Sequence, residues 1–345
     1  MNNNLKQRQS NFELLRIISM FLIVLGHVTY QTKFIYPKQT ILHNVSIQAL
    51  WIGGKLGVWE FTIISAYFLS HSKFKVKSLK KVWGVTLFYS IGLYMILVVA
   101  NVSPLTPKLL VRSMMPIITG QYWYVSAYIG MYVMVPYLNN MIGTMSKIEF
   151  RNFIIILIIM TEFLPLIKNH SYITGDTFFS LIPIYFVGGY LRKYSSDFEK
   201  QNKKYIIAFV LSIVAMVASI LLLDVVNGIM GTNISWDYFL TQNSPLQMIA
   251  AVSLFLIAKN TNISYNRAIN SVSASTFSVY LIHCHPALRW PVYLNIKQYE
   301  KTPWTALYEI LIAVGIYVCA TMIDYLRRLL LSLLKKCKQK ISVNY

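Results

Sequence analysis

Three ionisable residues, Glu13, Arg16 and His27, lie in or beside the first long apolar stretch of the sequence. A charged side chain at the centre of a bilayer costs at least roughly 2.5 to 3.5 kcal/mol, so ionisable groups in apolar stretches point to function. Histidine is also the side chain that exchanges protons most readily near neutral pH. This stretch is therefore the first candidate for proton-transfer chemistry.

The spacing places the three side chains on one side of a helix. Glu13 and Arg16 are three residues apart, close enough to form an ion pair. The eleven residues from Arg16 to His27 turn a helix through about 1100°, or three turns and roughly 20°, and raise it by about 16 Å. We predict a stripe of acid, base and imidazole. The alternative is an interfacial ion pair and a histidine held by a neighbouring helix.

Two polar residues, Glu60 and Ser65, fall inside the second apolar stretch. An isolated carboxylate at that depth should be neutral, paired or facing a wet cavity. A structural and a functional role for Glu60 are both open.

His283 and His285 resemble a chelating pair in the ninth apolar stretch. Residues i and i+2 of a helix point about 200° apart, so one helix cannot offer both rings to one metal ion. We therefore expect no metal site. Three cysteines are too few for a disulfide framework, and we assign them no function; they are Cys284, Cys319 and Cys337.

The composition requires a bilayer around most of the chain. Hydrophobic residues make up 56% of the 345 positions, charged residues make up 13%, and the mean hydropathy is +0.51. Soluble domains of this length do not show such values. We predict an all-α integral membrane protein, one domain over residues 1–345 with about ten transmembrane helices of about 20 residues each. The expected spans are residues 14–30, 48–70, 82–101, 121–139, 151–167, 174–191, 204–224, 240–258, 273–290 and 305–330.

The basic residues indicate topology rather than nucleic-acid binding. The chain has 32 Lys and Arg against 12 Asp and Glu, a net charge of +20. These basic residues gather in alternate loops, as the positive-inside rule describes. An even number of spans then places both termini in the cytoplasm. The polar start MNNNLKQRQSN leads into a full-length span and not into a cleavable signal.

Several motifs carry a resemblance to one enzyme family. An acidic residue, two residues, Arg, ten residues and His occur in that order at Glu13, Arg16 and His27. The stretch FTIISAYFL has Ser65 in the family's place, with Ala66 where glycine is usual. Glu60 stands one place after the position where the family often has an acid. On these motifs and those that follow, the chain resembles the membrane acyltransferase-3 family over nearly its whole length.

Three later motifs are also similar to this family. They are QYWYVSAYIGMYVMVP, which contains Trp123, then YFVGGYL, and VYLIH, which contains Tyr280 and His283. Gln121 or Tyr122 stands where the family frequently has a histidine before the tryptophan. Members of the family are bacterial multi-spanning enzymes that acylate capsules, O-antigens and other exopolysaccharides.

The resemblance implies a membrane O-acyltransferase of the bacterial cytoplasmic membrane, with acetyl as the expected group. Its donor would be cytoplasmic acetyl-CoA, and its acceptor a hydroxyl of a cell-surface polysaccharide or of a lipid-linked precursor. His27 would take the proton of that hydroxyl or carry the acyl group, and both remain open. Arg16, fixed by Glu13, would orient the donor.

Other cytoplasmic cations could meet the phosphates of the donor or could simply set topology. These cations are Lys80, Arg151 and Arg192. Two other functions also fit the polar stripe: a permease or flippase for a lipid-linked sugar or small anion, and a sensor or assembly subunit without turnover. Acyl transfer by the purified protein distinguishes the enzyme from a permease.

Overall fold

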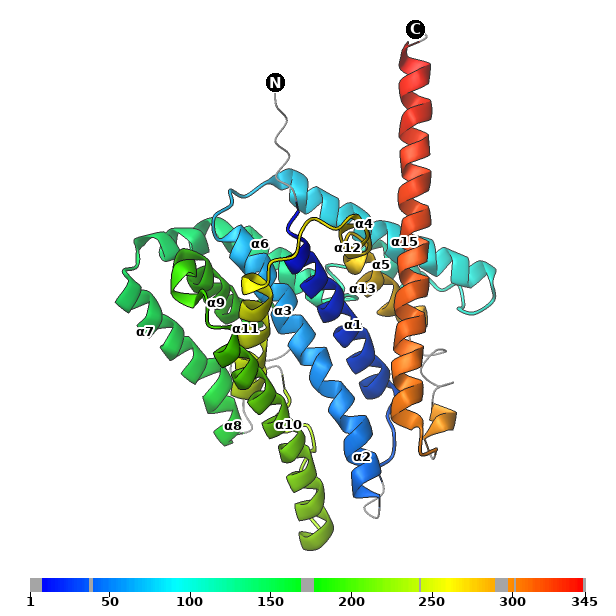
Figure 1. The fold of residues 1–345 in the computed structure, drawn as a ribbon. Helices are drawn as coiled ribbons and strands as arrows, with labels where there is room; N and C mark the ends of the chain where they lie inside the picture. The colour runs from blue at the N-terminus through cyan, green and yellow to red at the C-terminus, as the bar shows by residue number, and fades with distance from the viewer. Residues whose placement is uncertain are drawn as a thin grey trace.

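The computed structural model describes residues 8–36, 40–168, 177–241, 243–288, 297–300 and 302–343 of the chain. Within these ranges the chain forms only helices and loops, as expected (Figure 1). The helices of twelve residues or more are α1 (Ser10–Thr32), α3 (Ile52–Leu69), α4 (Val76–Val99), α6 (Trp123–Thr144), α7 (Lys147–Ile158), α9 (Leu181–Lys193), α10 (Asn202–Met230), α11 (Pro245–Asn260) and α15 (Thr305–Val343). The shorter helices are α2 (Ile41–Gln48), α5 (Pro107–Met114), α8 (Leu164–Lys168), α12 (Arg267–Ser273) and α13 (Thr276–His283).

Five helical segments are long and apolar enough to cross a membrane. They are Ser10–Thr32, Val76–Val99, Lys147–Ile167, Asn202–Met230 and Thr305–Leu334. The ten expected spans fall mainly on helices in the part of the chain that the structure describes. Some of these helices are short, since α11 has 16 residues and α13 has 8. The chain is therefore a plausible multi-pass membrane protein, whereas the number of crossings stays a prediction.

The expected span over residues 273–290 is not one continuous helix. Helix α12 ends at Ser273, and α13 runs from Thr276 only to His283. Pro286 explains the end of α13, because proline has no N–H group to donate and disfavours helical backbone in the residue before it. His283 is consequently the last residue of a helix and not a residue in its middle.

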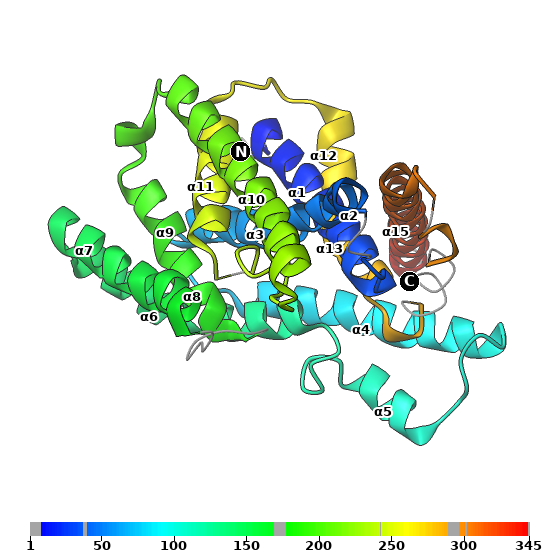
Figure 2. The same cartoon turned by 90° about the horizontal axis from the view of Figure 1, so that it is seen from below.

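Helix α1 lies among several other helices. It contacts α3, α11, α12, α13 and α15 (Figures 1 and 2). The start of α1 and the end of α15 point to the same end of the molecule, which we call the termini side (Figure 1). Helix α4 lies transverse to α15 in both views, so these two helices cannot both follow the membrane normal.

Glycines bring α1 and α3 into close contact. A Cβ atom added to Gly26 would lie 2.5 Å from the Cα atom of Gly54, and one added to Gly57 would lie 2.4 Å from the carbonyl oxygen of Ser19. Small residues commonly allow such close approach between helices in membranes. This close packing fixes the position of α1 against α3 in the region of His27.

A buried carboxylate, Asp324, connects helix α15 to the bundle. Asp324 accepts hydrogen bonds at its Oδ1 atom from Tyr89 of α4 at 2.7 Å and from Ser278 of α13 at 2.6 Å. Arg327 pairs with the same carboxylate at 2.7 Å. Because these partners come from three helices, the network holds α13 in place against α4 and α15.

Candidate active site

A cluster of His27, His283 and Cys284 lies where α1 meets the end of α13. The Nδ1 atom of His27 is 2.9 Å from the Nε2 atom of His283. The sulfur of Cys284 is 3.5 Å from His27 Nδ1 and 3.3 Å from His283 Nε2. On its other side, His283 Nδ1 is 2.7 Å from the carbonyl oxygen of Val279. The two histidines are 256 positions apart, so only the tertiary fold brings them together.

Contacts on both sides of α1 set the place of this cluster. Next to His27, Gly26 packs against Gly54 of α3. One half-turn later, Thr29 donates a hydrogen bond to Glu309 of α15 at 2.5 Å. Because α1 is held from two sides, His27 meets the end of α13 in a defined position.

The cluster lines a cavity of about 210 Å³, which we call the His27 cavity. Trp123 of α6 and Tyr280 of α13, both expected at the site, form part of its wall together with Gln121. Lys55 of α3 adds a positive charge, with its Nζ atom 5.5 Å from the ring centroid of Trp51. The cavity thus combines two imidazoles with a cation and aromatic rings.

Glu13 and Arg16 form the ion pair that their spacing indicates. Arg16 Nη1 donates to Glu13 Oε1 at 3.0 Å. The other oxygen of Glu13 accepts a hydrogen bond from Ser273 at the end of α12 and lies 3.7 Å from Arg8 Nη1. Glu13 is buried, whereas the side chain of Arg16 is 30% exposed. The carboxylate is therefore the fixed partner, and it orients a guanidinium that a ligand can reach.

Arg16 lines a second cavity of about 350 Å³, which we call the Arg16 cavity. Arg8 and Lys81 add two more cations to its wall, and Ser65 and Ser78 add hydroxyl groups. The remaining wall is largely apolar and includes residues of α4, α6 and α13. This combination suits a ligand with an anionic end and a long, weakly polar arm.

Aromatic residues of the two cavity walls contact one another. Tyr124 lines the Arg16 cavity, whereas its neighbour Trp123 and Tyr280 line the His27 cavity. The hydroxyl of Tyr280 accepts a hydrogen bond from the backbone N–H of Tyr124 at 3.3 Å, and the two rings are 6.1 Å apart. Thr62 holds the hydroxyl of Tyr124 at 3.2 Å. Arg16 and His27 therefore lie on one helix but line two different cavities, whose aromatic walls are in contact.

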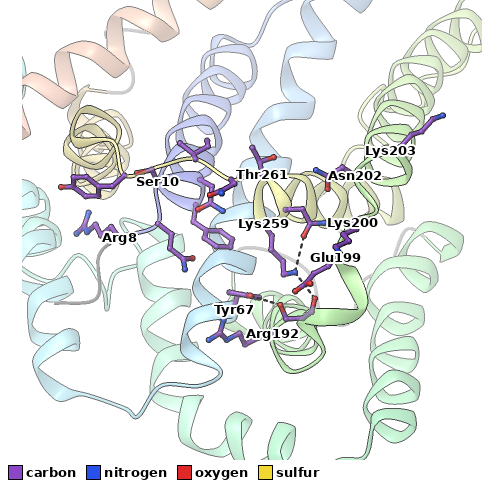
Figure 3. Close-up of a pocket in the computed structure, with 18 residues that line it drawn as sticks. Arg8, Ser10, Tyr67, Arg192, Glu199, Lys200, Asn202, Lys203, Lys259 and Thr261 are labelled. Atoms are coloured by element: carbon purple, nitrogen blue, oxygen red, sulfur yellow. Dashed lines mark hydrogen bonds between the residues drawn. The ribbon is translucent and has the colours of Figure 1, made fainter. Parts of the chain in front are cut away.

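A third and larger cavity, of about 1050 Å³, lies on the termini side, because residues at the start of α1 line it (Figures 1 and 3). We call it the basic basin, because Glu199 is its one acidic residue among five basic ones, which are Arg8, Arg192, Lys200, Lys203 and Lys259. Lys259 donates to the carbonyl oxygen of Ser195 at 3.0 Å, and the guanidinium of Arg192 lies 4.9 Å from the ring centroid of Tyr67. Arg8 lines both the basic basin and the Arg16 cavity, so the two adjoin.

The positive charge around the basin also acts on His71, in the turn after α3. Partial burial lowers the pKa of His71 below its usual 6.5, and the charges of Arg192 and Lys193 lower it further. Positive charges disfavour protonation of a nearby imidazole. Burial accounts for the largest part of the shift, and the two nearby positive charges add to it.

Glu60 and Ser65 have different surroundings. Glu60 is fully buried in α3, and neither carboxylate oxygen has a hydrogen-bond partner within the described ranges. It does not line the His27 cavity, the Arg16 cavity or the basic basin. Ser65 lines the Arg16 cavity, but its hydroxyl donates to the carbonyl oxygen of Phe61 at 2.8 Å. Ser65 can thus contribute to the wall, whereas Glu60 stands apart from the three cavities.

The three additional cations of the sequence analysis do not gather at one place. Arg192 lines the basic basin. Lys80 is exposed on α4 and lines none of the three cavities, whereas the next residue, Lys81, lines the Arg16 cavity. Arg151 is exposed on the peripheral helix α7, with Asn152 as a partner at 3.4 Å (Figure 2). Lys81 is thus better placed than Lys80 or Arg151 to contact a ligand in the Arg16 cavity.

Sequence reasoning missed the contribution of Cys284. His285 binds the carbonyl oxygen of Ser90 at 3.1 Å, and only His283 faces His27. One ligand atom each from His27, His283 and Cys284 lie within 4.8 Å of one another, a set that could hold a metal ion. The spacing of His283 and His285 already indicated that the two rings take different partners. That no metal is needed stays a prediction.

A family model described as an acyltransferase domain matches residues 9–325 of this chain. No curated protein and no solved structure shows a significant match. The matched range contains Glu13, Arg16, His27 and His283.

Proposed function

Since this chain belongs to the acyltransferase-3 family of membrane acyltransferases, we propose that it is an O-acetyltransferase that modifies a cell-surface polysaccharide or its lipid-linked precursor. Acetyl-CoA in the cytoplasm is the donor, and a sugar hydroxyl is the acceptor. One observation carries the proposal: Arg16 and His27 lie on one helix and line two cavities whose aromatic walls are in contact. A donor in one cavity and an acceptor in the other can meet where these walls touch.

The Arg16 cavity and the basic basin are the proposed donor side. Coenzyme A carries several phosphate charges, and guanidinium groups bind phosphate with strong, charge-assisted hydrogen bonds. Arg8, Arg16 and Lys81 line the narrower cavity, and Arg192 lines the basin beside it. We assign the phosphates to these cations and the acyl-bearing arm to the Arg16 cavity. For Lys80 and Arg151, the role in membrane topology is the simpler explanation.

His27 is the proposed catalytic group. As a general base, it takes the proton of the sugar hydroxyl while the hydroxyl oxygen attacks the thioester carbon. The bond from that carbon to sulfur breaks, and the thiolate of coenzyme A receives the proton that His27 accepted. In the alternative, His27 attacks the thioester carbon first and expels the thiolate. The sugar hydroxyl then attacks the acyl-imidazole and takes the acetyl group, and its proton neutralises the thiolate. Both routes need the imidazole at the boundary between donor and acceptor.

The test is a comparison of surface polysaccharide from the bacterial host with and without this gene. We expect NMR signals of O-acetyl esters to disappear when the gene is deleted and to return with the wild-type gene but not with His27→Ala. Purified protein in detergent should release free coenzyme A faster when an acceptor glycan is present than when water is the only acceptor.

The alternative function is a permease or flippase. In that case, the same two cavities would form a pathway, and purified protein in vesicles would move a lipid-linked sugar or anion without consuming acetyl-CoA. Unchanged ester signals in the deletion strain, together with such transport, would contradict the acetyltransferase.

A further inference from the structure

The hydrogen bonds of His283 determine which of its ring nitrogens carries a proton. Its Nδ1 atom lies 2.7 Å from the carbonyl oxygen of Val279. A carbonyl oxygen can only accept, so His283 Nδ1 must donate and must carry hydrogen. His283 is 6% exposed, and a buried charged imidazolium is far more costly than a neutral ring. The neutral ring has its lone pair at Nε2.

The second step concerns the 2.9 Å contact between His283 Nε2 and His27 Nδ1. This distance is within the range of an N–H hydrogen bond, so one proton lies between the two nitrogens. Since His283 Nε2 holds a lone pair, the proton belongs to His27 Nδ1. A neutral His27 then carries its own lone pair at Nε2.

We propose that His283 is a positioning residue that fixes the tautomer of His27, so that Nε2 of His27 is its basic nitrogen. The chain of donors runs from His27 to His283 and from His283 to the backbone of α13. The assignment of the tautomer does not depend on the proposed function. Only its consequence rests on that function, namely that His27 accepts the hydroxyl proton, or bonds to the acetyl carbon, through Nε2. In serine proteases, a carboxylate orients the catalytic histidine by the same logic.

A metal ion bound by His27, His283 and Cys284 is the competing arrangement. In a tetrahedral zinc site with Zn–N bonds of about 2.0 to 2.1 Å, two ligand nitrogens lie about 3.3 Å apart. The observed 2.9 Å is shorter and matches a hydrogen bond. A bound metal ion would therefore have to move the two rings apart.

The direct test is nitrogen NMR on full-length protein labelled with ¹⁵N-histidine, without any substrate. The chain has 6 histidines, and the spectrum of His27→Gln assigns the signals of His27. We expect a protonated Nδ1 and an unprotonated Nε2 at His27 in the wild type. In His283→Leu, which removes the acceptor, His27 should return to a mixture of tautomers.

Variants of the neighbouring cysteine separate the two arrangements. Cys284→Ala removes one metal ligand but neither of the two ring hydrogen bonds, so the His27 tautomer should persist. Protonation of His27 at Nε2 in the wild type would overturn the proposal. So would zinc or another transition metal at one ion per chain in elemental analysis, lost in Cys284→Ala.

Kinetics provide a readout that a purely structural residue would not give. His283→Leu should lower kcat by at least about tenfold, up to the hundredfold to ten-thousandfold typical of a general base, with KM for acetyl-CoA unchanged. His283→Gln can place an amide oxygen near the lost Nε2 atom and should recover most of kcat. Equal losses in both variants would contradict the role.

A control distinguishes this result from a failure of the proposed function. His285→Gln alters a buried histidine that binds a backbone carbonyl two residues away, and it should leave the His27 signals unchanged. If the protein transports rather than acetylates, the kinetic comparison disappears while the NMR result still stands.

Discussion

At the scale of single residues, His27 should be essential for transfer but not for folding. In His27→Ala, a lost hydrogen bond between helices costs on the order of 1 kcal/mol. A lost general base should reduce transfer about a hundredfold to ten-thousandfold. His27→Gln keeps hydrogen bonding but has no ring nitrogen to accept a proton, so it should be equally inactive. Acetylation assays on variants purified at wild-type yield test this expectation, and near-normal activity of His27→Gln would move the chemistry elsewhere.

Glu13 and Arg16 should behave as one unit. Their 3.0 Å ion pair means that either alanine variant disrupts the same donor contact. The double variant should therefore lose less than the sum of the two single losses in ln(kcat/KM). Arg16→Lys should also be impaired, because lysine keeps the charge but loses the planar fork. Arg151→Gln, on the peripheral helix α7, is the matched control and should retain activity. Additive losses would show that the two residues act separately.

At the scale of elements, the contact between α1 and α3 should not tolerate a methyl group. A Cβ atom at Gly57 would lie 2.4 Å from the carbonyl oxygen of Ser19, so Gly57→Ala must push the helices apart. Overpacking of this kind costs about 1 to 3 kcal/mol. We expect a lower unfolding temperature in detergent and lower activity, because α1 also carries His27.

A glycine in an open part of α4 provides the control. A Cβ atom at Gly84 would meet nothing within 4 Å among the described residues. Gly84→Ala should therefore be neutral or slightly stabilising, since alanine is favoured over glycine in a helix by about 1 kcal/mol. If Gly57→Ala proves as stable as Gly84→Ala, then α1 and α3 do not pack as closely at Gly57 as the structure indicates.

At the scale of the whole molecule, Arg192 of the basic basin should contribute to the lowered pKa of His71. Burial, then Arg192 and Lys193, lower the pKa of His71 below 6.5. Between the folded and unfolded pKa values, the unfolded chain binds more protons, so this histidine reduces the stability of the fold as pH falls below about 6.5. Arg192→Gln should raise the pKa part of the way back, as an NMR titration of His71 can show. An unchanged pKa would mean that Arg192 does not contribute to the shift.

The orientation of the molecule can be tested with reporter fusions. The positive-inside pattern predicts cytoplasmic positions after Lys77, Lys200 and Lys340, and external positions near Tyr36, Pro104 and Ile229. Helix α10 leads from the termini side, near Lys200, to the opposite end of the molecule at Ile229 (Figure 1). A reversed pattern would place Arg16 and the basic basin outside the cell and would contradict the proposed donor side.

The amino-acid sequence by itself predicted the helical class of the fold and the residues of α1 that share one face. Composition indicates a helical membrane protein because long apolar stretches need helices to satisfy their backbone groups in lipid. Spacing predicts the pair of Glu13 and Arg16 and the shared face with His27, because helix geometry is the same in every chain. Local rules of this kind need no knowledge of neighbouring helices.

Tertiary structure decided which distant residues complete the site. The partner of His27 is 256 positions away, and the fixed oxygen of Glu13 is bound by Ser273 from another helix. Packing of α1 against the end of α13 made His283 the partner of His27, whereas His285 binds the carbonyl oxygen of Ser90. The choice of Lys81 over Lys80 depends on the rotation of α4 against the Arg16 cavity. These pairings arise from helix packing, which depends on contacts between segments far apart in the chain, and a one-dimensional pattern does not specify them.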